Sequence, residues 1–466
     1  MKRIVFLLLF LLLLGFLLPP PSPAASRKLS VAVLPFVGEE KELGVALAEV
    51  LGHILSKVNS LSVIESGLIQ NLLEQEDQKE DDPVKVGKAL KTDLVISGRF
   101  TTEGDHLKLN VFSLNIESNQ DSFSDEVKGQ VQELFSLQEQ VAKDIIQYLQ
   151  LNLSSTEEKR VSLAARKPTA SLQAYIFYAQ GRRLATPRVK EDQKEDEITE
   201  VLVKQAGQES RFEEAIKLFQ KALALDGRFA LAHYELALAL QGAKAYMSRA
   251  NAMAELEKTI QIDPQLTEAY IAFGNLLRLT GERLRPDLDR AIKLFQKAVE
   301  LDPELIEAYT GLAETKAAIG EFDEAIAEYR KALTFDPDNP RLHYGLGGIY
   351  AGKGLYQEAI AKYQKATTLD QKFVEVYLAL GGLYHERGLY QEAVASYRRA
   401  AEIDPSRPDA SYGLALTLER VDMEQAIATW MRYIQLASDR PSERDWVDIA
   451  KKHLKKLQEK LKESKK

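Results

Sequence analysis

The chain has 466 residues, of which 45% are hydrophobic and 28% charged, and it contains no cysteine. This composition is typical of a globular protein, and the length corresponds to about three domains or to one domain with a repeat array. The absence of cysteine excludes disulfides, thiolate zinc sites, Cys-ligated iron–sulfur clusters and cysteine nucleophiles.

The net charge of −8 is distributed unevenly along the chain. Lys2, Arg3 and the lysine-rich segment 451–466 together carry +8, so the remaining residues carry −16. Such an acidic body repels a phosphate backbone, and we expect no nucleic-acid partner. The basic tail, 451–466, is the one segment excepted from this expectation.

The first 24 residues have the pattern of a secretory signal peptide. A basic start at Lys2 and Arg3 precedes the uncharged run 4–18, three prolines and the small residues 22–26. The apolar run is shorter than the ~20 residues that cross a bilayer, which favours a cleaved signal peptide. An uncleaved membrane anchor is the weaker alternative. No cysteine follows for a lipid anchor, and no second run of spanning length occurs. The prediction is an exported, periplasmic protein, with which peripheral membrane association is compatible.

Residues 25–152 alternate between strand and helix patterns, which predicts an α/β domain. The expected strands are 30–36, 61–64, 93–99, an alternating strand through Leu107, Leu109 and Val111, and one near Ser122. The expected helices are an apolar-periodic segment from Leu43 to Val58, then 67–75, 84–90 and 131–149. Residues 102–105 are expected to form a hairpin turn.

The same residues carry a family resemblance. VAVLPF, LGVALAEVLGHIL, LSVIE, LLEQE, VGKALKTDLVISGRF and EGDHLKLNVFSLNIES follow one another in this region. Together they resemble the TolB amino-terminal-like family, which is related to the flagellar FlgO and curli-export CsgG proteins. The resemblance implies an envelope-associated binding domain and supplies no catalytic residue.

After a linker expected at 153–170, residues 171–438 form a repeat. Asp-Pro or an equivalent pair recurs at Asp263, Asp302, Asp336, Asp370 and Asp404, and the last three steps are 34 residues each. This period is typical of the tetratricopeptide repeat, a helix-turn-helix unit. The chain is therefore similar to proteins whose helix pairs stack into an all-α, right-handed superhelical solenoid.

The positions within each 34-residue unit agree with this similarity. Position 8 of helix A is small, as in Gly274, Gly347 and Gly381, and position 24 of helix B is aromatic, as in Phe295, Tyr329, Tyr363 and Tyr397. Gly281, Gly320, Gly354 and Gly388 stand at the turn between the helices, where a left-handed residue ends helix A.

About seven units can be placed. The first begins at Ala174 and is interrupted by a charged insertion, 186–210, which is expected to be a solvated loop or a helix extension. Residues 439–466 are expected to form a capping helix and a basic tail, with Trp446, Ile449, Leu454, Leu457 and Leu461 on one face.

No arrangement of catalytic, cofactor-binding or metal-binding residues is predicted. The six histidines are scattered, and no two have metal-ligand spacing. Gly348 to Lys353 resembles a phosphate-binding loop only weakly, because it lacks the GKS or GKT ending. We expect no cofactor and no small-molecule substrate, and we predict that the chain is not an enzyme.

Function is instead predicted at the inner wall of the array. In tetratricopeptide proteins this wall is built from helix A positions 2, 5, 9, 12 and 13, which are expected to touch neither neighbour nor core. The candidate protein-binding residues are Tyr234, Leu238, Ile271, Asn275, Arg278, Tyr344, Leu378, His385, Tyr412, Leu416 and Arg420. Exposed apolar residues along one wall favour a protein or peptide ligand. The alternative is that the array curls over them or that the amino-terminal domain covers them.

Three functions are compatible with these features. The favoured one is a periplasmic scaffold or adaptor that binds envelope proteins through the repeats and the α/β domain. The second is a regulatory or sensor protein, because TolB-like domains also occur beside repeats in such proteins. The third is an enzyme, for which the residues outside the two assigned regions are too few to form a catalytic domain.

The export pattern makes the first testable prediction. Cleavage after Ala24 should yield a mature protein that begins at Ala25 and fractionates with the soluble periplasm. Amino-terminal sequencing of the mature protein measures this directly. An intact Met1 on membrane-embedded protein would contradict it.

Overall fold

The computed structural model describes residues 28–75, 82–104, 106–118, 120–130, 133–185, 197–243, 248–279 and 285–464. The chain divides into two compact units, one of residues 1–195 and 203–262 and one of residues 196–202 and 263–466. The predicted signal peptide lies outside the described residues, as do residues 186–196 of the predicted insertion.

The first unit contains a mixed five-stranded sheet of order β2-β1-β3-β4-β5. Its strands are β1 (Leu29–Val33), β2 (Leu61–Val63), β3 (Leu94–Glu103), β4 (His106–Asn115) and β5 (Gln120–Gln130). β1 pairs in parallel with β2 and β3, whereas β3, β4 and β5 are antiparallel. β1 is shorter than predicted because Pro35 has no N–H to donate. β3 is longer than predicted, so the hairpin turn contracts to residues around Gly104, whose φ is +61°.

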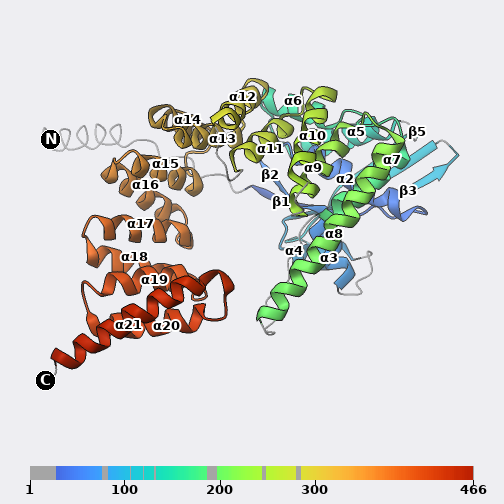
Figure 1. Cartoon of the computed structure of the whole chain (residues 1–466). Coiled ribbons are helices and arrows are strands. Elements are labelled where there is room, and N and C mark those ends of the chain that lie inside the picture. Colours follow the sequence, from blue (N-terminus) through green and yellow to red (C-terminus); the bar gives the residue numbers. More distant parts are fainter. Residues whose placement is uncertain are drawn as a thin grey trace, which may run out of the picture. The chain divides into compact units, whose positions relative to one another are not determined.

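Helices cover both faces of this sheet (Figure 1). They are α2 (Lys41–Leu55), α3 (Ser66–Gln75), α4 (Pro83–Leu90) and α5 (Leu134–Tyr148). Successive strand residues point to opposite faces, so Val31 and Val33 join the core of α2 and α5, whereas Ala32 and Leu34 join that of α3 and α4. The result is the three-layer α/β arrangement that strand and helix alternation favours.

The segment expected to be a linker contains a helix, α6 (Ser155–Ala164), which begins with a capping box between Ser154 and Glu157. The Glu157 carboxylate also accepts a hydrogen bond from the Asn59 N–H at 2.8 Å. Because Val161 is buried in the same core as α2, α6 is part of the first unit's packing.

The remaining helices of the first unit come from the repeat region. They are α7 (Leu172–Ala185), α8 (Glu197–Leu225), α9 (Ala230–Gly242) and α10 (Ser248–Ile262). One hydrophobic core runs from the sheet through α2 and α5 to α7, α8 and α9. The α/β domain and the first helices of the repeat region therefore share a core.

The second unit consists of helices that follow one another in pairs along the chain (Figure 1). They are α11 (Thr267–Arg278), α12 (Arg285–Leu301), α13 (Ile306–Ala318), α14 (Phe322–Phe335), α15 (Pro340–Gly352), α16 (Tyr356–Leu369), α17 (Val374–Glu386), α18 (Tyr390–Ile403), α19 (Pro408–Leu418), α20 (Met423–Ala437) and, after the short 3₁₀ turn η2 (Pro441–Glu443), α21 (Arg444–Ser464). The predicted fold class, an α/β region followed by an all-helical repeat solenoid, is confirmed.

The recurring aspartates stabilise the turns between one repeat and the next. The carboxylates of Asp302, Asp370 and Asp404 each accept a hydrogen bond from the backbone N–H two residues later, at 3.2, 2.8 and 3.0 Å. Such side-chain bonds satisfy backbone groups that the end of a helix leaves free. Gly320, Gly354 and Gly388 have φ of +87°, +83° and +74°, as predicted for the turn within a unit. Gly281 lies outside the described residues.

The aromatic ring at position 24 fills space that glycine leaves open on helix A. A Cβ atom added to Gly381 would lie 2.8 Å from the Tyr397 ring, and one added to Gly413 of the next repeat would lie 2.4 Å from it. Gly274 and Gly311 stand in the same relation to Phe295, at 2.7 and 2.3 Å. Each ring thus contacts its own helix A and the next one.

The last repeat is closed by α21, which packs on α20. Val447, Ala450 and Leu457 are the buried residues of α21. Trp446 was expected on the packed face, but it is 51% exposed. Its ring makes an edge contact with Tyr412, with centroids 5.4 Å apart. The packed face begins one residue later than predicted.

The glycine pair in α17 makes a prediction with an internal control. Gly381→Leu should lower the free energy of unfolding by about 1–3 kcal/mol, because the side chain would overlap the Tyr397 ring. Gly382→Ala should leave stability unchanged or raise it, because its Cβ would meet only the Tyr397 hydroxyl at an ordinary 3.6 Å. Urea denaturation measures both variants. Equal stabilities would show that Gly381 does not face the ring.

Candidate functional site

The predicted wall residues lie on the first helices of their repeats or directly after them. Tyr234 and Leu238 lie on α9 in the first unit, whereas the second unit carries Ile271, Asn275, Arg278, Tyr344, Leu378, His385, Tyr412, Leu416 and Arg420. All are half-buried except Arg420, which follows α19 and is exposed. Their role in binding stays a prediction.

The expectation that these residues touch neither neighbour nor core is wrong for several of them. Leu378 and Leu416 pack against apolar clusters, and Tyr344 and Tyr412 make ring contacts. The Tyr344 ring packs against Tyr363 and Phe373, with centroids 5.7 and 5.3 Å apart. The Tyr412 ring makes edge contacts with Trp430 and Tyr433. Both tyrosines therefore help to hold helices together as well as lining the wall.

Polar wall residues connect adjacent repeats. Arg278 on α11 forms an ion pair with Glu314 on α13, with 2.9 Å between Nη1 and Oε2. Nδ1 of His385 on α17 lies 2.9 Å from the Thr417 hydroxyl on α19. Burial lowers the pKa of His385, and Arg420 lowers it further. His385 is thus favoured as a neutral ring that fixes the spacing of two helices.

Glu314 also accepts a hydrogen bond from a position-24 tyrosine. The Tyr329 hydroxyl donates to Glu314 Oε1 at 3.2 Å. Burial, with a smaller contribution from Glu314, raises the pKa of Tyr329 far above its ordinary value. In this repeat the tyrosine hydroxyl is therefore a donor, and a residue of the inner wall, Glu314, is its acceptor.

The α/β domain occupies the corresponding wall of the first repeat. Counting from Ala174 as position 1, positions 5 and 9 of this repeat are Tyr178 and Arg182. α7, which carries both residues, packs against α2 and α3. At the first repeat, the alternative in which the amino-terminal domain covers the wall is the one observed.

A charged network joins the domain to this wall. Arg182 Nη1 lies 3.1 Å from Glu49 Oε2 on α2, and Arg182 Nε lies 3.0 Å from Glu235 Oε1 on α9. The Ser66 hydroxyl donates a hydrogen bond to Glu49. Burial raises the pKa of Glu235, and Arg182 opposes that shift. The guanidinium therefore compensates two carboxylates that lie largely out of solvent.

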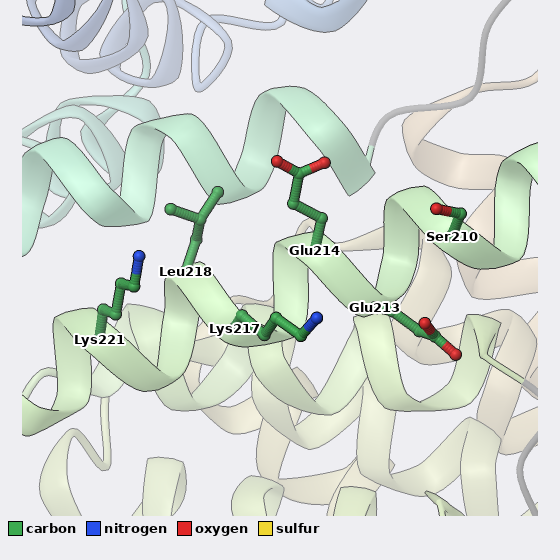
Figure 2. Close-up of a pocket in the computed structure, with 6 residues that line it drawn as sticks. All are labelled: Ser210, Glu213, Glu214, Lys217, Leu218 and Lys221. Atoms are coloured by element: carbon green, nitrogen blue, oxygen red, sulfur yellow. The ribbon is translucent and has the colours of Figure 1, made fainter.

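A cavity of about 350 Å³ lies along α8. Figure 2 shows its lining side chains, which all come from this one helix: Ser210, Glu213, Glu214, Lys217, Leu218 and Lys221. Neighbouring lysine and glutamate side chains on a single helix are usual for a solvated face. The cavity brings together no nucleophile and base from different elements.

Within the described ranges, no group of three or more histidine, aspartate or glutamate residues is arranged to hold a metal ion. His53 on α2 is half-buried, and desolvation lowers its pKa well below its ordinary value. Nε2 of His343 lies 2.9 Å from the Pro337 carbonyl oxygen.

Among the residues that the structure describes, no helix has both the length and the apolar character needed to cross a membrane.

Comparison with known families identifies the repeats. The family described as TPR repeat matches residues 316–354, 349–388 and 381–422, and the family described as tetratricopeptide repeat matches residues 202–265. The chain therefore contains tetratricopeptide repeats, as predicted. Proteins with this repeat generally mediate protein–protein interactions. A search of curated proteins finds no match.

Solved structures show partial similarity. The MamA protein is 24% identical over 38% of this chain and 96% of its own, with a TM-score of 0.33. YrrB, described as a TPR protein with an unusual peptide-binding site, is 26% identical over 43% of this chain and 97% of its own, with a TM-score of 0.33. The C-terminal part of a TPR repeat-containing protein from Cytophaga hutchinsonii is 19% identical over 50% of this chain and 93% of its own, with a TM-score of 0.39.

The charged network predicts a pH-dependent loss of stability. Arg182→Leu should lower the free energy of unfolding by about 2–3 kcal/mol at neutral pH, because Glu49 and Glu235 would keep buried charge without a cation. A buried carboxyl group with a raised pKa takes up a proton more readily when folded, so the deficit should shrink as the pH falls. Urea denaturation at neutral and acidic pH measures it.

Arg183→Leu is the matched control, because the Arg183 side chain has no ion-pair partner among the described residues. This variant should stay within about 0.5 kcal/mol of the wild type. A deficit for Arg182→Leu that did not change with pH would contradict the assigned role of the carboxylates.

Proposed function

We propose that the chain is a scaffold or adaptor of the cell envelope that binds protein partners through the inner wall of its second unit. The observation that carries the proposal is a set of half-buried apolar and aromatic side chains on the first helices α11, α15, α17 and α19, at Ile271, Tyr344, Leu378, Tyr412 and Leu416. Apolar side chains that stay partly open to solvent in a row are typical of a protein-binding surface.

The envelope location rests on the amino-terminal pattern and on the TolB-like motifs. A basic start, an apolar run and small residues before Ala25 favour export. The VAVLPF and VGKALKTDLVISGRF segments, which resemble an envelope-associated domain, form β1 with the residues after it and α4 with β3. On this proposal, the α/β domain contributes a second contact with an envelope component.

A regulatory or sensor role is the second candidate. It is favoured by the continuous core that joins the α/β domain to α7, α8 and α9. A ligand that displaced the domain from the first repeat would have to break the contacts of Arg182 with Glu49, which gives the two parts a physical means of coupling.

The proposal predicts loss of partner binding when the wall becomes polar. Leu378→Asn combined with Leu416→Asn should abolish capture of envelope proteins by the mature chain, because both leucines stand at wall positions and neither takes part in the ring contacts of Tyr344 or Tyr412. Both leucines also pack against apolar clusters, so the melting temperature of the variant is measured beside its binding. Cross-linking and mass spectrometry of envelope extracts compare the variant with the wild type. Leu389→Asn is the matched control, since Leu389 is a half-exposed leucine just before α18 and not at a wall position.

Proteins lost with the wall variant and retained with the control support the proposal. Capture that survives in the wall variant, with an unchanged melting temperature, would place binding on the α/β domain or on the basic tail instead.

A further inference from the structure

Two consecutive repeats carry glycine at position 9 of the inner wall. These glycines are Gly348 on α15, which is exposed, and Gly382 on α17, which is half-buried. A Cβ atom added to Gly348 would have only the Tyr363 hydroxyl within 4 Å, at 3.7 Å. One added to Gly382 would have only the Tyr397 hydroxyl, at 3.6 Å. Because each glycine has no side chain, the wall next to a tyrosine hydroxyl is left uncovered.

In the preceding repeat a side chain fills the space beside the tyrosine hydroxyl. There position 9 is Glu314, and its carboxylate accepts the hydrogen bond of Tyr329. The repeat before that has Phe295 at position 24, which has no hydroxyl group to satisfy. Repeats five and six therefore retain the phenol and lack the acceptor.

The two hydroxyls are donors without an acceptor within the described part of the chain. Tyr363 is only 5% exposed, and no described residue accepts a hydrogen bond from it or from Tyr397. Burial raises the pKa of Tyr363 to about 12 and that of Tyr397 to about 12, so both phenols keep their protons at neutral pH. Tyr397 is half-buried, and neither hydroxyl is among the buried side-chain atoms that lack a partner. Both hydroxyls therefore reach the surface of the wall, where a ligand that accepts their hydrogen bonds takes the place of water.

We propose that Gly348 with Tyr363 and Gly382 with Tyr397 form two successive subsites for main-chain carbonyl groups of an extended peptide segment. This inference rests on the proposed protein-binding function and specifies its ligand chemistry. Without a side chain at position 9, a peptide backbone can approach the helix closely and reach the hydroxyl beneath. Tyr344 and Leu378, four residues before each glycine on the same helix face, contact the peptide side chains.

The surroundings favour a neutral acceptor over a carboxylate. Glu386 and Asp409 both lie near enough to the Tyr397 phenol to contribute to its raised pKa. A ligand carboxylate at this subsite would meet two like charges, whereas a peptide carbonyl carries no net charge. The Tyr397 subsite therefore selects backbone from the middle of a segment and not its carboxyl terminus.

The test uses the full mature chain and peptides selected on it from a random dodecapeptide display library. Tyr363→Phe combined with Tyr397→Phe should weaken the affinity of a selected peptide about tenfold, because two hydrogen bonds are lost while both rings remain. Its melting temperature should not fall, since neither hydroxyl has a partner to lose. Tyr329→Phe is the control: it removes the hydroxyl bonded to Glu314 and should leave peptide affinity unchanged.

The origin of the acceptor is tested on the peptide. Replacing single backbone amides with esters should reduce affinity at two positions, because an ester carbonyl is a poorer acceptor. These two losses should disappear in the double phenylalanine variant. Gly348→Glu combined with Gly382→Glu, which copies the fourth repeat, should fold normally and lose the peptide.

Selected peptides that bind the double phenylalanine variant as well as the wild type, yet lose affinity for Leu378→Asn with Leu416→Asn, would overturn the inference and leave the proposed function intact. A wild-type chain that selects no peptide would overturn both.

Discussion

The structure of the second unit depends on one contact, the wedging of an aromatic ring between two helices that have no side chain at the point of contact. Tyr397 lies against Gly381 in its own repeat and Gly413 in the next, at separations that no Cβ atom could share. Close packing of this kind transmits small changes in volume. Because one ring contacts both helices, it also fixes the distance from one repeat to the next, on which any surface that spans several repeats depends.

The same contact determines which polar atoms reach the inner wall. When a tyrosine ring lies between the two helices, its hydroxyl reaches the inner wall. The residue at position 9 then determines whether the hydroxyl has a hydrogen-bond acceptor. Glu314 satisfies the Tyr329 hydroxyl, whereas Gly348 leaves that of Tyr363 open. On the proposed function, the same side chains would serve both stability and recognition. This is why the replacement of Tyr344 or Tyr412, whose rings are also packed, would confuse a loss of binding with a loss of fold.

Much of this fold could be predicted from sequence because its determinants are local. A 34-residue period, a small residue at position 8 and an aromatic at position 24 recur in most repeats, so the helix pairs and the contact of Gly381 with Tyr397 follow from counting. The contacts of the wall residues with the next repeat cannot be predicted by counting, because they depend on the rotation between successive repeats. The ion pair between Glu49 and Arg182 joins residues 133 positions apart. Its only local signal is that Glu49 is the single acidic residue within the apolar segment LGVALAEVLGHIL.

A repeat buries its apolar faces only against neighbours, so each end of an array needs a partner of another kind. At the first repeat this partner is the α/β domain, which places Glu49 against Arg182 and continues one core into α7. At the last repeat it is α21, where Glu419 Oε1 lies 2.8 Å from the Trp430 indole nitrogen and 2.7 Å from His453 Nδ1. Both ends thus combine apolar burial with a carboxylate that contacts two hydrogen-bond donors or cations.

A polar group that is only partly hydrogen-bonded in a packed interface is less favourable than an apolar group in its place. Such networks therefore favour one docking geometry over others of similar apolar area. Each end of the array is therefore held in one arrangement with its own partner.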